Sequence, residues 1–286
     1  LLLALLMLAW LVLYVRGWLR LRRRGAQNLA SVYRLLVFLT ATALIGAVLL
    51  SPNSWLNSRY LFMRSLQTVV LCLLAAPAFH LACGYDVLLW GLPDGARRAL
   101  RRRLQPGDAA GEAVRTITPA AGVWLAFIVL FLIWHEPGVA NFLLALPALH
   151  TVVLALLGLS ALLFWWPVLN ADPSPWRMNH PTRLLYLFMQ MPQNAFLANA
   201  IYEAGTVRYK HYADLARTWG PSALRDQEYA GIMMWGGGDL LFLAAMGFIA
   251  YGWVKHEERE AKRVDRQLAR ERAARKAGSA PAASEG

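Results

Sequence analysis

The feature that most constrains this chain is a series of long apolar segments, each close to the length of a membrane-spanning helix. A helix needs about 20 apolar residues to cross the hydrocarbon core of a bilayer. The sequence has seven such segments, separated by arginine-rich or Pro/Gly-rich connections. They lie near residues 1–15, 30–50, 60–82, 117–135, 142–168, 183–202 and 229–254. Because a spanning segment must satisfy its own backbone hydrogen bonds, we predict an all-α, polytopic integral membrane protein built as a seven-transmembrane-helix bundle.

The positive charges predict how this bundle is oriented. Of the 29 lysine and arginine residues, 23 fall in alternate connections and the C-terminal tail, and six fall on the opposite side. Positive residues concentrate in cytoplasmic loops. We therefore expect the N-terminus outside and the C-terminus in the cytoplasm, with the first segment an anchored span rather than a cleaved signal peptide. The net charge of +12 is explained in the same way and does not indicate nucleic acid as a partner.

Two regions follow from the distribution of charge. Residues 1–254 are predicted to form the bundle, and residues 255–286 a charged cytoplasmic tail. The tail begins with acidic and basic residues spaced three to four apart, which is typical of a solvated helix, and ends in an Ala/Ser/Pro-rich stretch expected to be disordered. A solvated extension is the preferred interpretation of this tail, and a docking site is the alternative.

No catalytic motif is recognisable, so we expect a protein that is not an enzyme. The sequence lacks a phosphate-binding loop, a nucleophile elbow and a zinc-protease motif. All four lysines, which a retinal protein would need inside a span, lie in an outer loop or in the tail. Cys72 and Cys83 are eleven residues apart, do not form a metal-binding motif, and are expected to be small buried side chains.

Three polar residues in or beside the spans are candidates for function. His135 ends the fourth span and His150 lies in the outer part of the fifth, so these imidazoles could share a metal or a haem iron. Each could equally bond a backbone carbonyl. Asp239, in "WGGGDLLF", is an acid within a span, which is a functional candidate by default. Its alternatives are a proton or ion site and a broken helix in which the carboxylate bonds exposed backbone. The outer loop 203–228 is predicted to form a lid or a partner surface.

Several stretches together resemble the CtaG-type cytochrome c oxidase assembly family, from about residue 34 to 256. They include "LSPNSWLNSRYLF", "WHEPGVANFLLALPALH", "LLFWWPVLNADPSP" and "LRDQEYAGIMMWGGGDLLFL". The last corresponds to a family segment whose motif residues are here Asp226, Gln227, Gly231, Met234 and Trp235. The resemblance implies a multi-pass protein of the bacterial inner (plasma) membrane that works with haem–copper oxidases, with copper as the candidate cofactor and lipids around it.

The chain departs from this family at the residues that would bind copper. Where the family's third span begins with His-Met-x-Gln-His, this chain has Arg64 at the first position and keeps only Gln67. In the fifth span His150 remains, but the glutamate and second histidine are replaced by Val153 and Leu154. A guanidinium has no lone pair for a metal and keeps its positive charge.

We therefore interpret Arg64 as the mark of a site whose metal has been lost, and expect it to form an ion pair with Glu136 or Glu203. Two functions remain open. One is a membrane factor of cytochrome c oxidase assembly that delivers or inserts copper. The other is an accessory or scaffold subunit, without metal, of a respiratory or other membrane complex. A solute or proton transporter that uses Asp239 is a third, less supported class.

Overall fold

The computed structural model describes residues 2–49, 58–82, 84–103, 120–170, 178–217 and 219–278, and every element in these ranges is helical. The first half contains α1 (Leu2–Arg23), α2 (Val32–Leu49), α4 (Leu61–Val69), α5 (Ala76–Leu81), α6 (Gly84–Gly91), α7 (Asp94–Arg103) and α9 (Ala120–His135). The second half contains α10 (Pro137–Leu144), α11 (Pro147–Leu169), α12 (His180–Phe188), α13 (Met191–Tyr202), α14 (Lys210–Ala213), α15 (Ala223–Ile232) and α16 (Leu240–Gly278). Two π-helical segments, η1 (Val70–Ala75) and η2 (Met233–Asp239), lie inside longer helices. The all-helical prediction is confirmed.

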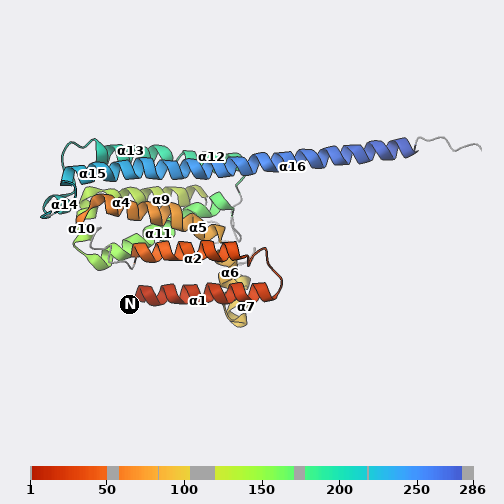
Figure 1. The fold of residues 1–286 in the computed structure, drawn as a ribbon, viewed down its shortest axis with the longest axis horizontal. Helices are drawn as coiled ribbons and strands as arrows, with labels where there is room; N and C mark the ends of the chain where they lie inside the picture. The colour runs from red at the N-terminus through yellow and green to blue at the C-terminus, as the bar shows by residue number, and fades with distance from the viewer. Residues whose placement is uncertain are drawn as a thin grey trace, which may run out of the picture.

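The long helices run side by side along one axis and form a bundle with two distinct ends (Figure 1). The short helices α10 and α14 lie at one end, which we call the α14 end. The helices α6 and α7 lie at the other, the α7 end, and α16 continues far beyond the bundle on that side. The predicted disordered end of the tail, residues 279–286, lies outside the described residues.

Five helical segments are long and apolar enough to cross a membrane, and a bent pair makes a sixth. The five are Leu3–Arg23, Val32–Leu49, Leu61–Leu81, Pro147–Leu169 and Ala223–Arg272. The bent pair is α9 and α10, which meet at 71°. The predicted span 183–202 is divided into α12 and α13, with Pro192 in the first turn of α13, where proline is tolerated because those N–H groups lack helical partners. The count of seven therefore remains a prediction.

Several predicted boundaries move. The first helix extends to Arg23 rather than ending near residue 15, so its arginines continue the helix. The fifth predicted span starts at Pro147, because residues 142–144 belong to α10. A proline at position 137 and another at 147 each occupy the start of a helix, which separates the two elements.

The apolar interior forms two clusters. The larger contains Trp134, Phe164 and Trp165 and joins η1, α9, α11 and the last helix; Cys72 is buried there and unpaired, while Cys83 lies outside the described residues. The smaller joins α1, α2, α5 and α6, and within it the ring of Tyr14 on α1 stacks on that of Phe38 on α2.

The contact of α1 with α6 needs two glycines. A Cβ on Gly17 would lie 1.8 Å from the Val87 carbonyl oxygen, and one on Gly91 would lie 2.0 Å from the Leu13 carbonyl oxygen. Only glycine permits backbones to come this close. The approach of the two helices is therefore set by the absence of side chains at these positions.

Candidate functional site

Arg64 lies buried at the α14 end, where it closes the C-terminus of α9. Its side chain is 2% exposed, and Nη2 donates a hydrogen bond of 2.8 Å to the carbonyl of Trp134. The guanidinium carbon also lies 4.1 Å from the centroid of the Trp134 ring. The last carbonyls of a helix have no partner within it and carry partial negative charge. A buried cation at this point satisfies one of them and gains a cation–π contact.

The prediction that Arg64 forms an ion pair with Glu136 or Glu203 is wrong. Within the described ranges Arg64 contacts no carboxylate, and its Nη1 atom has no hydrogen-bond partner. The Glu136 side chain instead accepts a 2.6 Å hydrogen bond from the backbone N–H of Val139 and caps the N-terminus of α10. Glu136 caps a helix because α10 begins at the next residue, directly after the bend that ends α9. The carbonyl that Arg64 binds carries no signal in the sequence.

His135 is the last residue of α9, and His150 on α11 packs beside it against Trp134, but the two imidazole rings do not contact each other. His135 is buried and its Nδ1 donates to the Phe131 carbonyl at 2.7 Å, so Nε2 holds the lone pair and has no partner. The His150 ring, whose Nε2 is also unpartnered, lies 5.0 Å from the Trp134 ring centroid. No contact between the two imidazole rings occurs in the described part of the chain. Trp134 thus contacts both Arg64 and His150.

Two tyrosines from the segment between α13 and α15 complete this region. Tyr209 donates a 2.6 Å hydrogen bond to the carbonyl of His135, which satisfies a second terminal carbonyl of α9. The Tyr212 phenol lies close enough to the Arg64 guanidinium for the two groups to interact electrostatically. Burial raises the pKa of Tyr212 to about 12, although the charge of Arg64 acts in the opposite direction. Burial also raises the pKa of Tyr209. Both side chains are therefore neutral phenols at physiological pH.

This donor set fits a copper ion poorly. It offers two imidazole nitrogens on separate helices and two neutral phenols, around a guanidinium that holds a permanent positive charge. Copper would need further nitrogen or sulfur donors, and a cation at this place would be repelled by Arg64. No group of three or more His, Cys, Asp or Glu side chains arranged for a metal occurs within the described residues.

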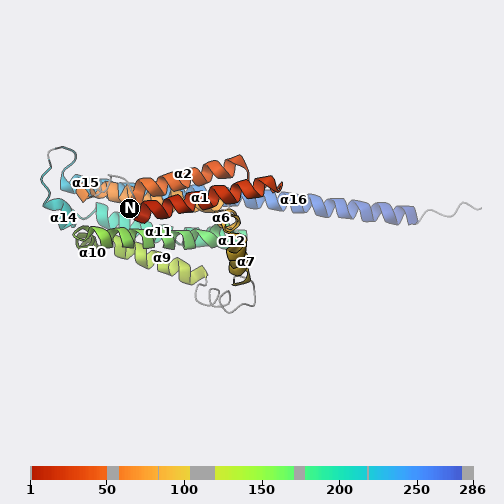
Figure 2. The same cartoon turned by 90° about the horizontal axis from the view of Figure 1, so that it is seen from below.

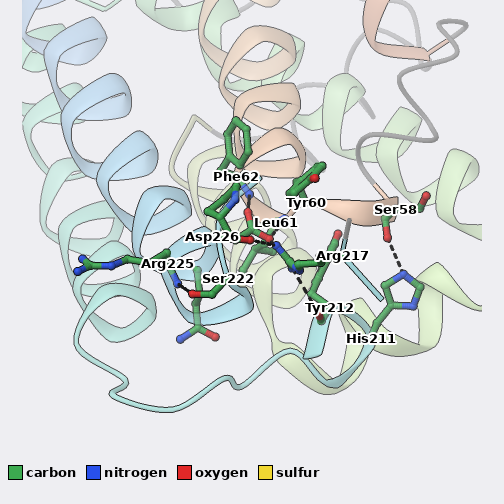
Figure 3. A network of polar contacts seen from close by, with 12 residues as sticks. Ser58, Tyr60, Leu61, Phe62, His211, Tyr212, Arg217, Ser222, Arg225 and Asp226 are labelled. Atoms are coloured by element: carbon green, nitrogen blue, oxygen red, sulfur yellow. Dashed lines mark hydrogen bonds and ion pairs between the residues drawn. The ribbon is translucent and has the colours of Figure 1, made fainter. Parts of the chain in front are cut away.

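Asp226 of the family motif joins three separate segments at the same end (Figure 3). Its buried carboxylate accepts hydrogen bonds from the backbone N–H groups of Leu61, at 2.9 Å, and Phe62, at 3.0 Å. It also accepts one from Arg217 Nη2 at 3.0 Å. Because Tyr60, the residue before α4, provides no side-chain cap, the carboxylate of a distant helix caps α4 instead. Asp226 is thus a structural clamp.

Gln227 holds the loop that follows α13. Its Oε1 atom accepts from the backbone N–H of Arg208 at 2.9 Å, and its Nε2 atom donates to the carbonyls of Ile201 and Thr206, both at 3.1 Å. All three partners are backbone groups, so the amide replaces secondary structure in the turn. The predicted lid, residues 203–228, is therefore held against the bundle by hydrogen bonds of two of its own residues, Asp226 and Gln227.

The remaining predicted residues lie apart from this region. Gln67 Nε2 donates to the Val48 carbonyl at 2.6 Å and links α4 to α2. Trp235 is 61% exposed on the outside of the bundle. Gln67 thus bonds to α2 from the same helix that carries Arg64, and Trp235 lies on the exposed surface.

The Asp239 carboxylate accepts a hydrogen bond from a side chain and not from backbone groups exposed by a helix break. Asn194 Nδ2 lies 2.8 Å from Asp239 Oδ1 and 2.8 Å from the carbonyl of Met234. The helix continues through η2 as a π turn, so the expected break is absent. Such π turns are frequent at functional sites. Of the three preceding glycines only Gly238 is tightly packed: a Cβ there would lie 2.8 Å from Asn194 Nδ2, so the Asn194 side chain would have to shift.

Sequence reasoning missed the residues that complete these contacts. Three of these contacts are made to backbone carbonyls: Arg64 binds that of Trp134, Tyr209 that of His135, and Asn194 that of Met234. The other two missed residues are Arg217, which binds the Asp226 carboxylate, and Tyr212, which lies near Arg64. The available signal was weak: Arg217 stood among loop charges, and Asn194 was a polar residue inside a predicted span.

A comparison with known families decides the relationship. The sequence model of the cytochrome c oxidase caa3 assembly factor family (Caa3_CtaG) matches residues 12–256, most of the chain. The chain belongs to this family. In this member of the family, Asp226 and Gln227 of the motif hold the α14 end of the bundle together, and Arg64 lies at the C-terminus of α9.

Similar proteins also occur in mycobacteria. Uncharacterised proteins of Mycobacterium bovis and Mycobacterium tuberculosis are each 30% identical to this chain over 105 residues, and one of Mycobacterium leprae is 27% identical over the same length. Each match covers 36% of this chain and 16% of the relative. The chain therefore matches only a small part of these longer proteins. No solved structure matches.

Proposed function

We propose that this member of the family takes part in the assembly of a haem–copper cytochrome c oxidase as a membrane scaffold that binds the oxidase, without catalysing a reaction and without carrying copper at the α14 end. The observation that carries the proposal is the buried Arg64 guanidinium between α4, α9 and the loop tyrosines. A fixed positive charge there stabilises the same helix ends that a metal could otherwise hold together.

Copper delivery is the second candidate, and the two histidines favour it. Neither Nε2 atom has a hydrogen-bond partner, and the bond from His135 Nδ1 to the Phe131 carbonyl leaves His135 Nε2 with the lone pair that binds metals. They lie on α9 and α11, however, without a direct contact and beside a cation. Delivery at this place would need Arg64 to move away or a partner protein to supply additional ligands.

The distribution of charge supports a plasma-membrane topology with seven crossings. The arginine-rich C-terminus of α1, the helix α7 and the start of the tail all lie at the α7 end (Figure 1). This end is proposed to face the cytoplasm, with α12 and α13 together forming one crossing. Reporter fusions after residues 103 and 278 should then both indicate a cytoplasmic location, and a reporter inserted after residue 205 the opposite one.

Copper content and association test the function. The full chain, solubilised in mild detergent, is loaded with Cu(I) under reducing conditions, and its metal is measured by mass spectrometry. A native gel of the same sample shows which proteins comigrate. The proposal expects copper well below one equivalent, unchanged by His135→Ala, together with oxidase subunits in a fixed ratio.

The other outcomes are equally clear. About one copper per chain, lost in both His135→Ala and His150→Ala, would establish delivery and overturn the scaffold. Absence of copper and of any oxidase subunit from the native complex would overturn the partnership with the oxidase.

A further inference from the structure

The lipid-facing side of α1 carries a shallow hollow with an apolar lining. Its volume is about 540 Å³, and it is lined entirely by α1. The lining consists of apolar side chains between residues 11 and 19 and of the hydrocarbon stems of Arg16, Arg20 and Arg23, so each guanidinium group is carried next to an apolar surface. These positions are separated by three or four residues, so the arginines share one helix face with the apolar groups.

The arginines of this hollow differ in their availability. Arg20 Nη1 donates to the carbonyls of Trp90, at 3.1 Å, and Leu92, at 2.8 Å, and so holds the C-terminus of α6 against α1. Arg16 and Arg23 are exposed, and neither makes an ion pair or side-chain hydrogen bond within the described residues. Two cations on one face are therefore free to bind an anion.

The position of Arg16 along α1 indicates that the anion is a lipid headgroup rather than a soluble ion. Arg16 lies seven residues before Arg23, which is about 10 Å along the helix axis. Val12 and Leu19 beside it are exposed, as expected for a surface that faces acyl chains. A cation among lipid-facing apolar residues extends toward the interface or binds a phosphate drawn in to meet it.

The surrounding elements add charge at the same level. The helices α6 and α7 lie beside the C-terminal part of α1 in both views (Figures 1 and 2). The Trp90 ring has the guanidinium of Arg24 at 4.7 Å and that of Arg97 at 4.2 Å, and Arg22 lies 4.9 Å from the Trp18 ring. Tryptophan is enriched at the headgroup level of membranes. The hollow thus opens at the depth of lipid phosphates.

We propose that this hollow binds one anionic phospholipid. Its phosphate lies between Arg16 and Arg23, and one acyl chain follows the apolar residues between positions 11 and 19. Charge complementarity favours an anionic lipid over a zwitterionic one, because a choline headgroup would place a positive charge among five arginines between residues 16 and 24. The length of the apolar part favours a lipid over a soluble phosphate.

Native mass spectrometry of the full chain in detergent tests this proposal. Phosphatidylglycerol, phosphatidylcholine with the same acyl chains, and glycerol phosphate are added in separate titrations. One phosphatidylglycerol per chain should be retained, with an affinity at least about tenfold above that of phosphatidylcholine, and glycerol phosphate should not compete. The double variant Arg16→Gln/Arg23→Gln should lose about thirty-fold in affinity for phosphatidylglycerol, whereas Arg16→Lys/Arg23→Lys should retain most of it.

A matched control separates the site from net charge. The variant Arg270→Gln/Arg272→Gln removes the same charge from the exposed part of α16 and should leave the affinity unchanged. An equal loss in this control would overturn the proposal in favour of a general charge effect. Equal retention of phosphatidylcholine would reduce the hollow to an apolar surface, and competition by glycerol phosphate would make it a site for soluble phosphates. Thermal unfolding of each variant confirms that the fold is intact, which is expected because Arg20 is unchanged.

Discussion

Replacing Asp226 by alanine is the sharpest test of how the α14 end is held together. The carboxylate is fully buried and accepts three hydrogen bonds, from the N–H groups of Leu61 and Phe62 and from Arg217. Bonds to a charged group contribute about 1.5–3 kcal/mol each, and the Arg217 side chain keeps 13% exposure. Taking the low end of that range gives about 4.5 kcal/mol, within the roughly 3–5 kcal/mol lost when a buried ion pair is broken.

The free energy of unfolding in mixed micelles, followed by circular dichroism as the fraction of denaturing detergent increases, measures this loss. The control is Glu228→Ala, because Glu228 pairs with the exposed Arg225 and removing a surface pair should cost about 0.5 kcal/mol or less. Asp226→Asn should fall between the two, since one oxygen acceptor remains. A loss below about 1 kcal/mol for Asp226→Ala, or one equal to that of the control, would refute the assignment of Asp226 as a clamp.

Three further substitutions test other contacts, each by the same unfolding measurement. Arg64→Ala should lower the free energy of unfolding by about 2–4 kcal/mol, because it removes the hydrogen bond to Trp134 and its cation–π contact, and Arg64→His should restore no copper binding. Gly17→Ala should destabilise by about 1–3 kcal/mol through the clash with α6, whereas Gly95→Ala, whose Cβ meets nothing within 4 Å, should be neutral or stabilising. Asn194→Ala should cost about 1–3 kcal/mol by leaving the buried Asp239 carboxylate without its amide donor; a value near zero would mean that the π turn is held by other contacts.

The apolar pattern was sufficient to predict the class of fold and most helices, because lipid imposes length and composition on each spanning segment. It predicted the end of α9 at residue 135, but not the separate helix α10 that follows it, nor the interruption between α12 and α13. Pro137 and Pro192 lie in the first turns of α10 and α13, where a proline is compatible with the start of a new helix. The π turns were also missed, since one extra residue in a helical turn leaves composition unchanged.

The candidate site was predicted less well than the fold. The sequence singled out Arg64 as a candidate, but its partner was sought among acidic side chains. The actual partner is the Trp134 carbonyl, a group that every residue carries and that becomes available only where a helix ends. Likewise the motif pair Asp226 and Gln227 acts almost wholly on backbone groups. Side-chain identity alone contains no information about such partners.

The clamp at Asp226 also has a consequence for the order in which the chain is completed. Residue 226 is synthesised long after Leu61 and Phe62, the two N–H groups that it caps. Since chains are made from the N-terminus, the first donors of α4 have no access to this cap until α15 has been synthesised. A nascent chain halted before residue 226 therefore presents the start of α4 without its carboxylate cap.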